Sequence, residues 1–212
     1  MTYHEICASV HKLKRKFGDA DPFQLCKDMG ILLLFQPMGK HETAIKGFYM
    51  LCKRVRSITV NSDLPEIIQK IIVAHELGHG LHKDVLKQQI MNFGNLLLMA
   101  VMVWLVVRDP QLHQAFGFVD VNYGFAYILL GIGLGLVQPL TGMVMNVYSR
   151  YAEFRADCQA VREGYGEAMV TALKKLAKEN FAHLAPSPIN VVLEYSHPPL
   201  SDRIAKVEKA SK

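Results

Sequence analysis

The strongest chemical signal in the chain is the pentapeptide HELGH at residues 75–79. On a helix its two histidines, His75 and His79, lie one turn apart on the same face, close enough to share one metal ion. Imidazole nitrogens are good zinc ligands, and a catalytic zinc site keeps one position open for water. Glu76 directly follows the first histidine, where its carboxylate can take a proton from that water. The motif therefore predicts a zinc site with Glu76 as general base.

The surroundings of HELGH favour this interpretation over a chance match. With the histidine and glutamate content of this chain, chance alone gives such a pentapeptide with a probability on the order of 2%. Residues 71–74 form an apolar lead-in typical of a buried helix. Gly78 has no side chain, so we expect another backbone to approach the helix closely at this point.

Two histidines do not complete a zinc site, and Glu153 is the best candidate for the third ligand. It lies four residues before Asp157, so the two carboxylates share one face of a helix. Glu153 would bind the metal while Asp157 orients a metal-bound imidazole from behind. Spacing alone leaves one alternative open, in which this pair lies on a solvated face together with Arg150 and Arg155.

The segments before HELGH predict a small unit of helices and strands that positions the motif. We expect helices at residues 1–17 and 22–29, and short strands at residues 31–35, 47–51 and 57–61. Asp21 and Pro22 are typical of a helix start, and Gly30 of a helix stop. An exposed strand edge within residues 47–61 could hold a peptide substrate as an added strand.

Two long segments without charge, residues 88–107 and 121–149, follow the motif. As a helix, the first spans about 30 Å at ~1.5 Å per residue, enough to cross the core of a bilayer. The second contains closely spaced glycines that allow membrane helices to pack together. The two segments predict a transmembrane hairpin. A buried helical pair in a soluble domain stays open as the alternative, because several amides weaken the apolar pattern: Asn92, Asn95, Gln138 and Asn146.

Charge around the hairpin predicts its orientation. Basic residues flank its open end: Lys83, Lys87, Arg150 and Arg155. The connecting loop carries Arg108, which Asp109 and Asp120 offset. The positive-inside rule therefore places both termini and the zinc site on the cytoplasmic side. The formal net charge of +5 suits a surface near anionic lipid better than nucleic-acid binding, because no basic run interleaved with aromatics is present.

The remaining composition argues against two other kinds of site. None of the four cysteines forms a CxxC pair, which argues against a zinc ribbon and against a disulfide framework, and favours a reducing compartment. The amino terminus has no apolar stretch typical of a secretory signal.

Past the hairpin we expect helices at residues 149–162 and 167–180, with a break at residues 164–166, and a last short helix after Pro199.

From residue 75 to about residue 205 the chain resembles the integral-membrane zinc metalloproteases of the CAAX prenyl protease type. HELGH, the segment SRYAEFRAD at residues 149–157 and YSHPPL at residues 195–200 carry the resemblance. It implies that His75, His79 and Glu153 bind zinc and that Glu76 is the base. It also implies that His197 stabilises the oxyanion or binds substrate, with help from Arg203. Without the resemblance, His197 is as easily an ordinary loop histidine beside two prolines.

The first 85 residues resemble a second family, the soluble ImmA/IrrE zinc metallopeptidases, some of which cleave transcriptional repressors. The similarity lies in DPF at residues 21–23, IKGFY at residues 45–49, SITVN at residues 57–61 and the HELGH helix. CAAX-type proteases have further membrane helices before HELGH that enclose a reaction chamber, and this chain shows none of them. We therefore expect a zinc peptidase without strict CAAX specificity.

These observations predict an α+β, zincin-like metallopeptidase in three parts. Residues 1–87 contain the sheet and the HExxH helix, residues 88–149 form the transmembrane hairpin, and residues 150–212 complete the site. The expected activity is that of an endopeptidase with one Zn²⁺ per chain at the cytoplasmic membrane surface, acting on membrane-associated polypeptides in CAAX-type or quality-control proteolysis. Two alternatives remain: a soluble repressor-cleaving peptidase, and a non-enzymatic membrane protein with a structural zinc site.

Overall fold

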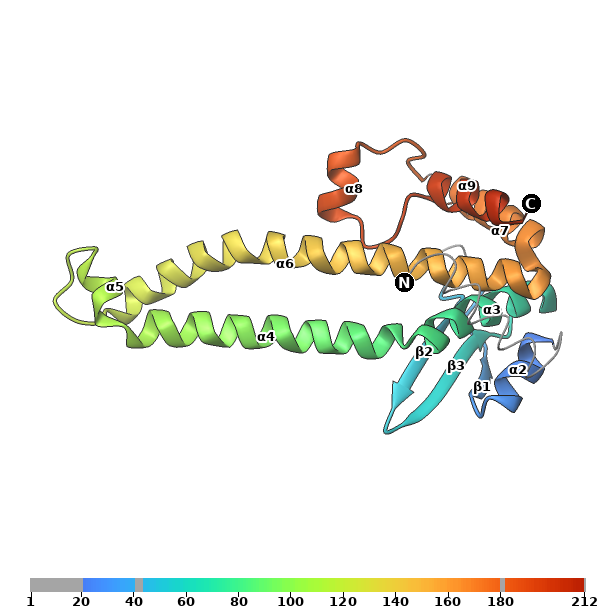
Figure 1. Cartoon of the computed structure of the whole chain (residues 1–212), viewed down its shortest axis with the longest axis horizontal. Coiled ribbons are helices and arrows are strands. Elements are labelled where there is room, and N and C mark those ends of the chain that lie inside the picture. The colour runs from blue at the N-terminus through green and yellow to red at the C-terminus, as the bar shows by residue number, and fades with distance from the viewer. Residues whose placement is uncertain (1–20, 41–43, 180–181, 212) are drawn as a thin grey trace.

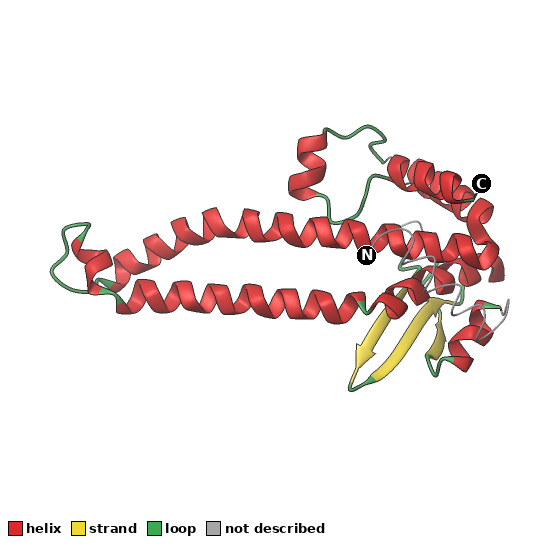
Figure 2. Ribbon diagram, viewed as in Figure 1, coloured by secondary structure: helices red, strands yellow, loops and turns green. Residues whose placement is uncertain are grey.

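The computed structural model describes residues 21–40, 44–179 and 182–211, so the helix expected at residues 1–17 lies outside the described part. The molecule is elongated. Two long helices form a hairpin that projects from a compact end, and this end contains the sheet and most of the shorter helices (Figure 1). The mixed α+β class agrees with the prediction, and the strands gather at the open end of the hairpin (Figure 2).

A three-stranded sheet forms one side of the compact end. Its strands are β1 (Leu32–Gln36), β2 (Gly47–Cys52) and β3 (Val55–Asn61), and the helix α2 (Pro22–Asp28) precedes them. β3 is central, pairing in parallel with β1 and antiparallel with β2. The three expected strands are confirmed within a few residues. β1 and β2 are the edges of the sheet, while Ile58 and Val60 of β3 are fully buried.

The HELGH motif lies on α3 (Glu66–His82), between two hydrophobic clusters. Val73 and Leu77 pack against the sheet and α2, and Ile71 packs against the carboxy-terminal helices. Burial of apolar side chains on both sides holds this helix in place. The helix ends at Lys83, whose left-handed conformation (φ 55°) turns the chain sharply into the next helix.

The hairpin consists of α4 (Asp84–Arg108), the short tip helix α5 (Pro110–Gln114) and α6 (Tyr123–Ala160). Both long helices are long and apolar enough to cross a membrane. Almost none of the apolar stretch of α4, and none of that of α6, is buried. A core helix of a soluble domain would be covered by other parts of the chain, and the described residues do not cover these two helices.

α6 runs without a break through residues 149 and 150, where the sequence predicted that one helix ends and another begins. The onset of charge at Arg150 marks a change of surroundings along one continuous helix. The expected boundary between the second and third parts therefore lies inside α6, and the three-part division stays a prediction.

The carboxy-terminal elements pack back onto α3 and α6. They are η1 (Val161–Tyr165), α7 (Gly166–Glu179), α8 (Pro188–Glu194) and α9 (Leu200–Ala210). The chain kinks at Gly164, whose φ of 87° favours glycine, as the sequence predicted for this region. Met169 and Leu173 of α7 and Val207 of α9 form one cluster with Ile71 of α3. The last helix starts directly after Pro199, also as expected.

Candidate metal centre

The three predicted metal ligands converge at the open end of the hairpin, where α3 packs against α6. We call this end, residues 83–87 and 148–160, the foot of the hairpin. The Nε2 atom of His75 lies 3.6 Å from one carboxylate oxygen of Glu153, and the Nε2 atom of His79 lies 3.6 Å from the other. One ligand atom from each of the three residues lies within 4.8 Å of the other two. The structure thus brings together two imidazoles and a carboxylate that are far apart in the sequence.

The spacing and chemistry of these atoms fit a zinc ion. Tetrahedral zinc with bonds of roughly 2.0–2.1 Å separates its ligand atoms by about 3.4 Å. The two 3.6 Å separations at Glu153 are close to this value. Two histidines and one glutamate also form one of the ligand sets found in catalytic zinc sites, where the fourth position is left for water.

Gly78 explains how the two helices come so close. A Cβ atom at this position would lie 2.8 Å from the Cα of Ala156 and 3.1 Å from the Cβ of Gln159. Any side chain here would push α6 away from α3. The prediction that another backbone approaches at Gly78 is therefore confirmed, and that backbone belongs to the helix that carries Glu153.

Two further carboxylates face the opposite sides of the histidine rings. The Nδ1 atom of His75 lies 3.0 Å from Asp157, in a contact bent away from ideal hydrogen-bond geometry. The Nδ1 atom of His79 lies 3.1 Å from Asp84. A carboxylate at Nδ1 favours a proton on that atom, which leaves the Nε2 lone pair free for a metal. Asp157 thus occupies the position the sequence suggested, whereas Asp84 was missed.

The alternative that Glu153 and Asp157 lie on a solvated face is wrong. Glu153 and Asp157 are 8% and 1% exposed, and Arg155 is 4% exposed. Arg150 donates hydrogen bonds to the carbonyl oxygens of Val191 and Tyr195. The charged side chains of this segment therefore pair within the protein.

Arg203 of α9 supports the two buried acids on α6. Its guanidinium donates two hydrogen bonds to Asp157, at 2.7 and 2.6 Å, and lies 3.3 Å from Glu153. Burial by itself raises the pKa of Glu153, but the nearby imidazoles of His197, His79 and His75 and the guanidinium of Arg203 outweigh it. The pKa of Glu153 is consequently held far below its usual range. An ionised carboxylate is the form that binds a metal.

Glu76, the residue after His75 on α3, reaches toward β2 beside the candidate ligands. Its carboxylate accepts a hydrogen bond from the backbone N–H of Tyr49, at 2.8 Å. Because β2 pairs with β3 on its other side, the free edge of the strand faces Glu76. The predicted base therefore lies between the HELGH helix and an edge of β2 that pairs with no other strand in the described part of the chain.

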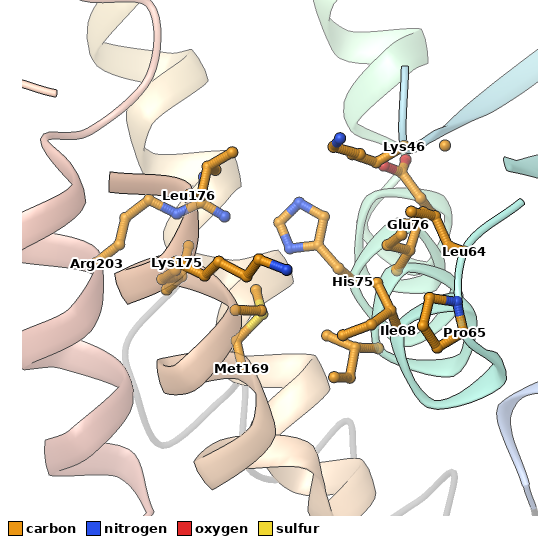
Figure 3. A pocket seen from close by; sticks show the side chains of 15 residues that line it. Lys46, Leu64, Pro65, Ile68, His75, Glu76, Met169, Lys175, Leu176 and Arg203 are labelled. Atoms are coloured by element: carbon orange, nitrogen blue, oxygen red, sulfur yellow. The ribbon is translucent and has the colours of Figure 1, made fainter. Parts of the chain in front are cut away.

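An apolar cavity of about 330 Å³ opens beside His75 and Glu76. Its wall is built from α3 and α7, with Arg203 across from His75 (Figure 3). Its larger apolar side chains include Ile68, Ile71, Ile72, Met169, Leu173 and Leu176. The cavity has the size and polarity of a pocket for an apolar side chain.

His197 lies at the same site, in the segment between α8 and α9. Its Nδ1 atom is 3.3 Å from Glu153, and the side chain is 67% exposed. The adjacent carboxylate of Glu153 raises the pKa of His197. The structure thus brings the predicted residue to the edge of the centre, while its role in catalysis stays a prediction.

A helix bearing HExxH, a small sheet beside it and a glutamate on a second helix together define a zinc metallopeptidase site. Comparison with known proteins gives the family. The chain belongs to Peptidase family M48, whose sequence pattern matches residues 49–211.

Among curated relatives, a CAAX prenyl protease 1 homolog of Oryza sativa is 32% identical over 66% of this chain and 33% of its own length. A homolog from Dictyostelium discoideum is 26% identical over 97% of this chain and 47% of its own length. The crystal structure of S. mikatae Ste24p shares the fold, with a TM-score of 0.70 at 20% identity. The superposed part covers 88% of this chain and 49% of the Ste24p chain.

The chain therefore spans about a third to a half of these relatives. The resemblance of the amino-terminal part to ImmA/IrrE peptidases receives no support. The Dictyostelium match instead extends the CAAX-type likeness to nearly the whole chain.

Proposed function

We propose that this chain is a zinc-dependent endopeptidase that holds one Zn²⁺ through His75, His79 and Glu153. The observation that carries the proposal is the convergence of these three side chains at donor spacings suited to zinc, with Glu76 beside them. Bound zinc would supply a Lewis acid that polarises the scissile carbonyl and acidifies a water molecule.

Glu76 takes the proton of that water and passes it to the leaving amine. The N–H of Tyr49 holds the carboxylate of Glu76 in place before the reaction. The free edge of β2 binds the substrate as an added strand, because that edge faces Glu76 and the apolar cavity. His197 stabilises the developing oxyanion from the exposed side of the centre.

The test of this proposal separates zinc binding from turnover. Glu76→Gln keeps the size of the side chain and an oxygen for the Tyr49 N–H, but it removes the base. We expect normal zinc content by elemental analysis and at least a roughly 10²–10⁴-fold loss of peptidase rate. Activity within tenfold of wild type would refute Glu76 as the base. A variant without zinc would instead make Glu76 part of the metal site.

We also propose that α4 and α6 span the bilayer with the metal centre at the cytoplasmic surface. Support comes from their exposed apolar side chains and from Lys83 and Lys87, which are exposed at the foot of the hairpin. If the hairpin spans the membrane, the site must lie close to the headgroups, because His79 and Glu153 flank the hairpin on either side. Polypeptides already bound at that surface would reach it most easily.

The substrates we propose are therefore membrane-associated polypeptides. Several relatives carry the name CAAX prenyl protease 1, which makes prenylated carboxy-terminal peptides one candidate and membrane-protein quality control another. One peptide sequence with and without a lipid anchor, offered to the enzyme in proteoliposomes, tests the role of the membrane. We expect faster cleavage of the anchored form. Equal cleavage of both forms would favour a soluble substrate, such as a transcriptional repressor.

A further inference from the structure

Each candidate histidine ligand is backed by an aspartate, and each aspartate is paired with an arginine. On one side the series is His75, Asp157 and Arg203. On the other side Asp84 contacts His79 and is paired with Arg155. The first series links α3 to α6 and α9. The second links α3 to the first residue of α4 and to α6, the two long helices of the hairpin.

Asp84 uses both of its oxygens in the second series. Oδ2 lies 3.1 Å from the Nδ1 atom of His79. Oδ1 accepts a hydrogen bond from the hydroxyl of Tyr148, at 2.8 Å, and pairs with the guanidinium of Arg155. Tyr148 and Arg155 are seven residues apart and therefore lie on the same face of α6. The guanidinium also lies over the ring of Tyr151, 4.6 Å from its centroid.

The burial of this group argues against a purely stabilising role. Asp84 is 2% exposed and Arg155 is 4% exposed. For a buried ion pair, the cost of removing two charges from water offsets most of their attraction. What such a pair does provide is a fixed position, because any movement of either group leaves a buried charge without its partner. Here the fixed oxygen is the one that faces a candidate zinc ligand.

We propose that Asp84 is a positioning residue for the metal centre and that Arg155 and Tyr148 act through it. Asp84 keeps the proton of His79 on Nδ1 and aims Nε2 at Glu153. Because its partners lie on α6, the packing of α4 against α6 at the foot of the hairpin sets the geometry of the site. This inference rests on the proposed zinc site but goes beyond it, since it assigns a role to three residues that contact neither metal nor substrate.

The test measures the zinc dissociation constant of the full chain in detergent, by competition with a fluorescent chelator. We expect Asp84→Asn to weaken zinc binding by roughly 10–100-fold, as is typical when the partner of a metal-bound histidine is lost. Tyr148→Phe removes one of the hydrogen bonds that hold Asp84, so we expect a smaller loss of roughly 2–10-fold. Asp120→Asn, in the exposed loop at the far end of the hairpin, is the matched control and should leave zinc binding unchanged.

A double variant separates positioning from mere stability. Asp84→Asn with Arg155→Met leaves no unpaired charge, so the fold should recover, as followed by thermal unfolding with excess zinc. If Asp84 positions His79, zinc binding by the double variant stays as weak as in Asp84→Asn alone. Recovery of wild-type zinc affinity would overturn the proposal, because only an uncompensated charge would then have been at fault.

The outcomes also separate this inference from the proposed function. A wild-type protein that binds no zinc would refute both. A wild type that binds zinc and an Asp84→Asn variant within threefold of it would refute the role of Asp84 alone. Should Asp84→Asn fail to fold, the double variant and Tyr148→Phe supply the same comparison.

Discussion

The foot of the hairpin and its shaft, residues 88–107 of α4 and 123–147 of α6, differ in what they bury. The helix α6 runs through both. At the foot, charged side chains are enclosed and paired, as Asp84 with Arg155 and Asp157 with Arg203. Along the shaft, large apolar side chains such as Phe93 and Leu136 are 68% exposed. One helix thus passes from a largely buried polar centre to a surface suited to hydrocarbon. The difference explains why charged residues begin at Arg150 although α6 continues to Ala160.

Packing shows the same contrast. At the foot, Gly78 lies so close to Ala156 that a methyl group would not fit, while Gly94, Gly131 and Gly135 in the shaft have open space around the position of a Cβ atom. The foot is therefore a tightly packed junction, as a metal site requires of the elements that carry its ligands. Gly133 is the exception in the shaft, because a Cβ atom there would lie 2.9 Å from the flexible end of the Met102 side chain.

The largest effect that tests this comparison concerns the shaft. If its exposed apolar side chains face lipid, the protein should fractionate with membranes and resist extraction by alkaline carbonate. Solubilisation should require detergent. Release into the soluble fraction without detergent would contradict the membrane hairpin and favour a soluble peptidase.

A smaller effect sharpens the contrast in packing. Gly78→Ala should destabilise the protein by about 1–3 kcal/mol, because the added methyl overlaps the backbone of α6, and it should weaken zinc binding by displacing Glu153. Gly94→Ala in α4 meets open space and should change stability by no more than about 1 kcal/mol, with unchanged zinc affinity. Thermal unfolding in detergent and zinc titration measure both. Equal effects of the two variants would show that the foot is no more tightly packed than the shaft.

Much of the site was predictable from local sequence, and what was missed depends on tertiary packing. HELGH specifies its own geometry because one helical turn separates the histidines, and Asp157 follows Glu153 by the same spacing. Asp84 carried no comparable signal. It reaches His79 only because Lys83 adopts a left-handed conformation at the end of α3. Likewise, the sequence around Arg155 looks like that of a charged surface residue. Only the structure shows that Arg155 is buried and paired with Asp84 of α4.

The fold was predictable to a similar degree and for similar reasons. The strands and the break near Gly164 follow from apolar runs and from glycine. The continuity of α6 did not follow, because a change from apolar to charged residues is a sign of a new environment and gives no information on where a helix ends. The orientation of the hairpin and the three-part division remain predictions.

The central claim is that the helix returning from the hairpin completes a zinc site begun by HELGH. Its most direct test is the zinc content and zinc dissociation constant of Glu153→Ala. Glu167→Ala, which removes an exposed glutamate from the first turn of α7, is the matched control. We predict that Glu153→Ala loses zinc, with a drop in affinity beyond the roughly 10–100-fold typical of an outer partner, while Glu167→Ala binds normally. Zinc binding by Glu153→Ala at wild-type affinity would contradict the claim, and Asp157 or His197 would then be the next candidates for the third ligand.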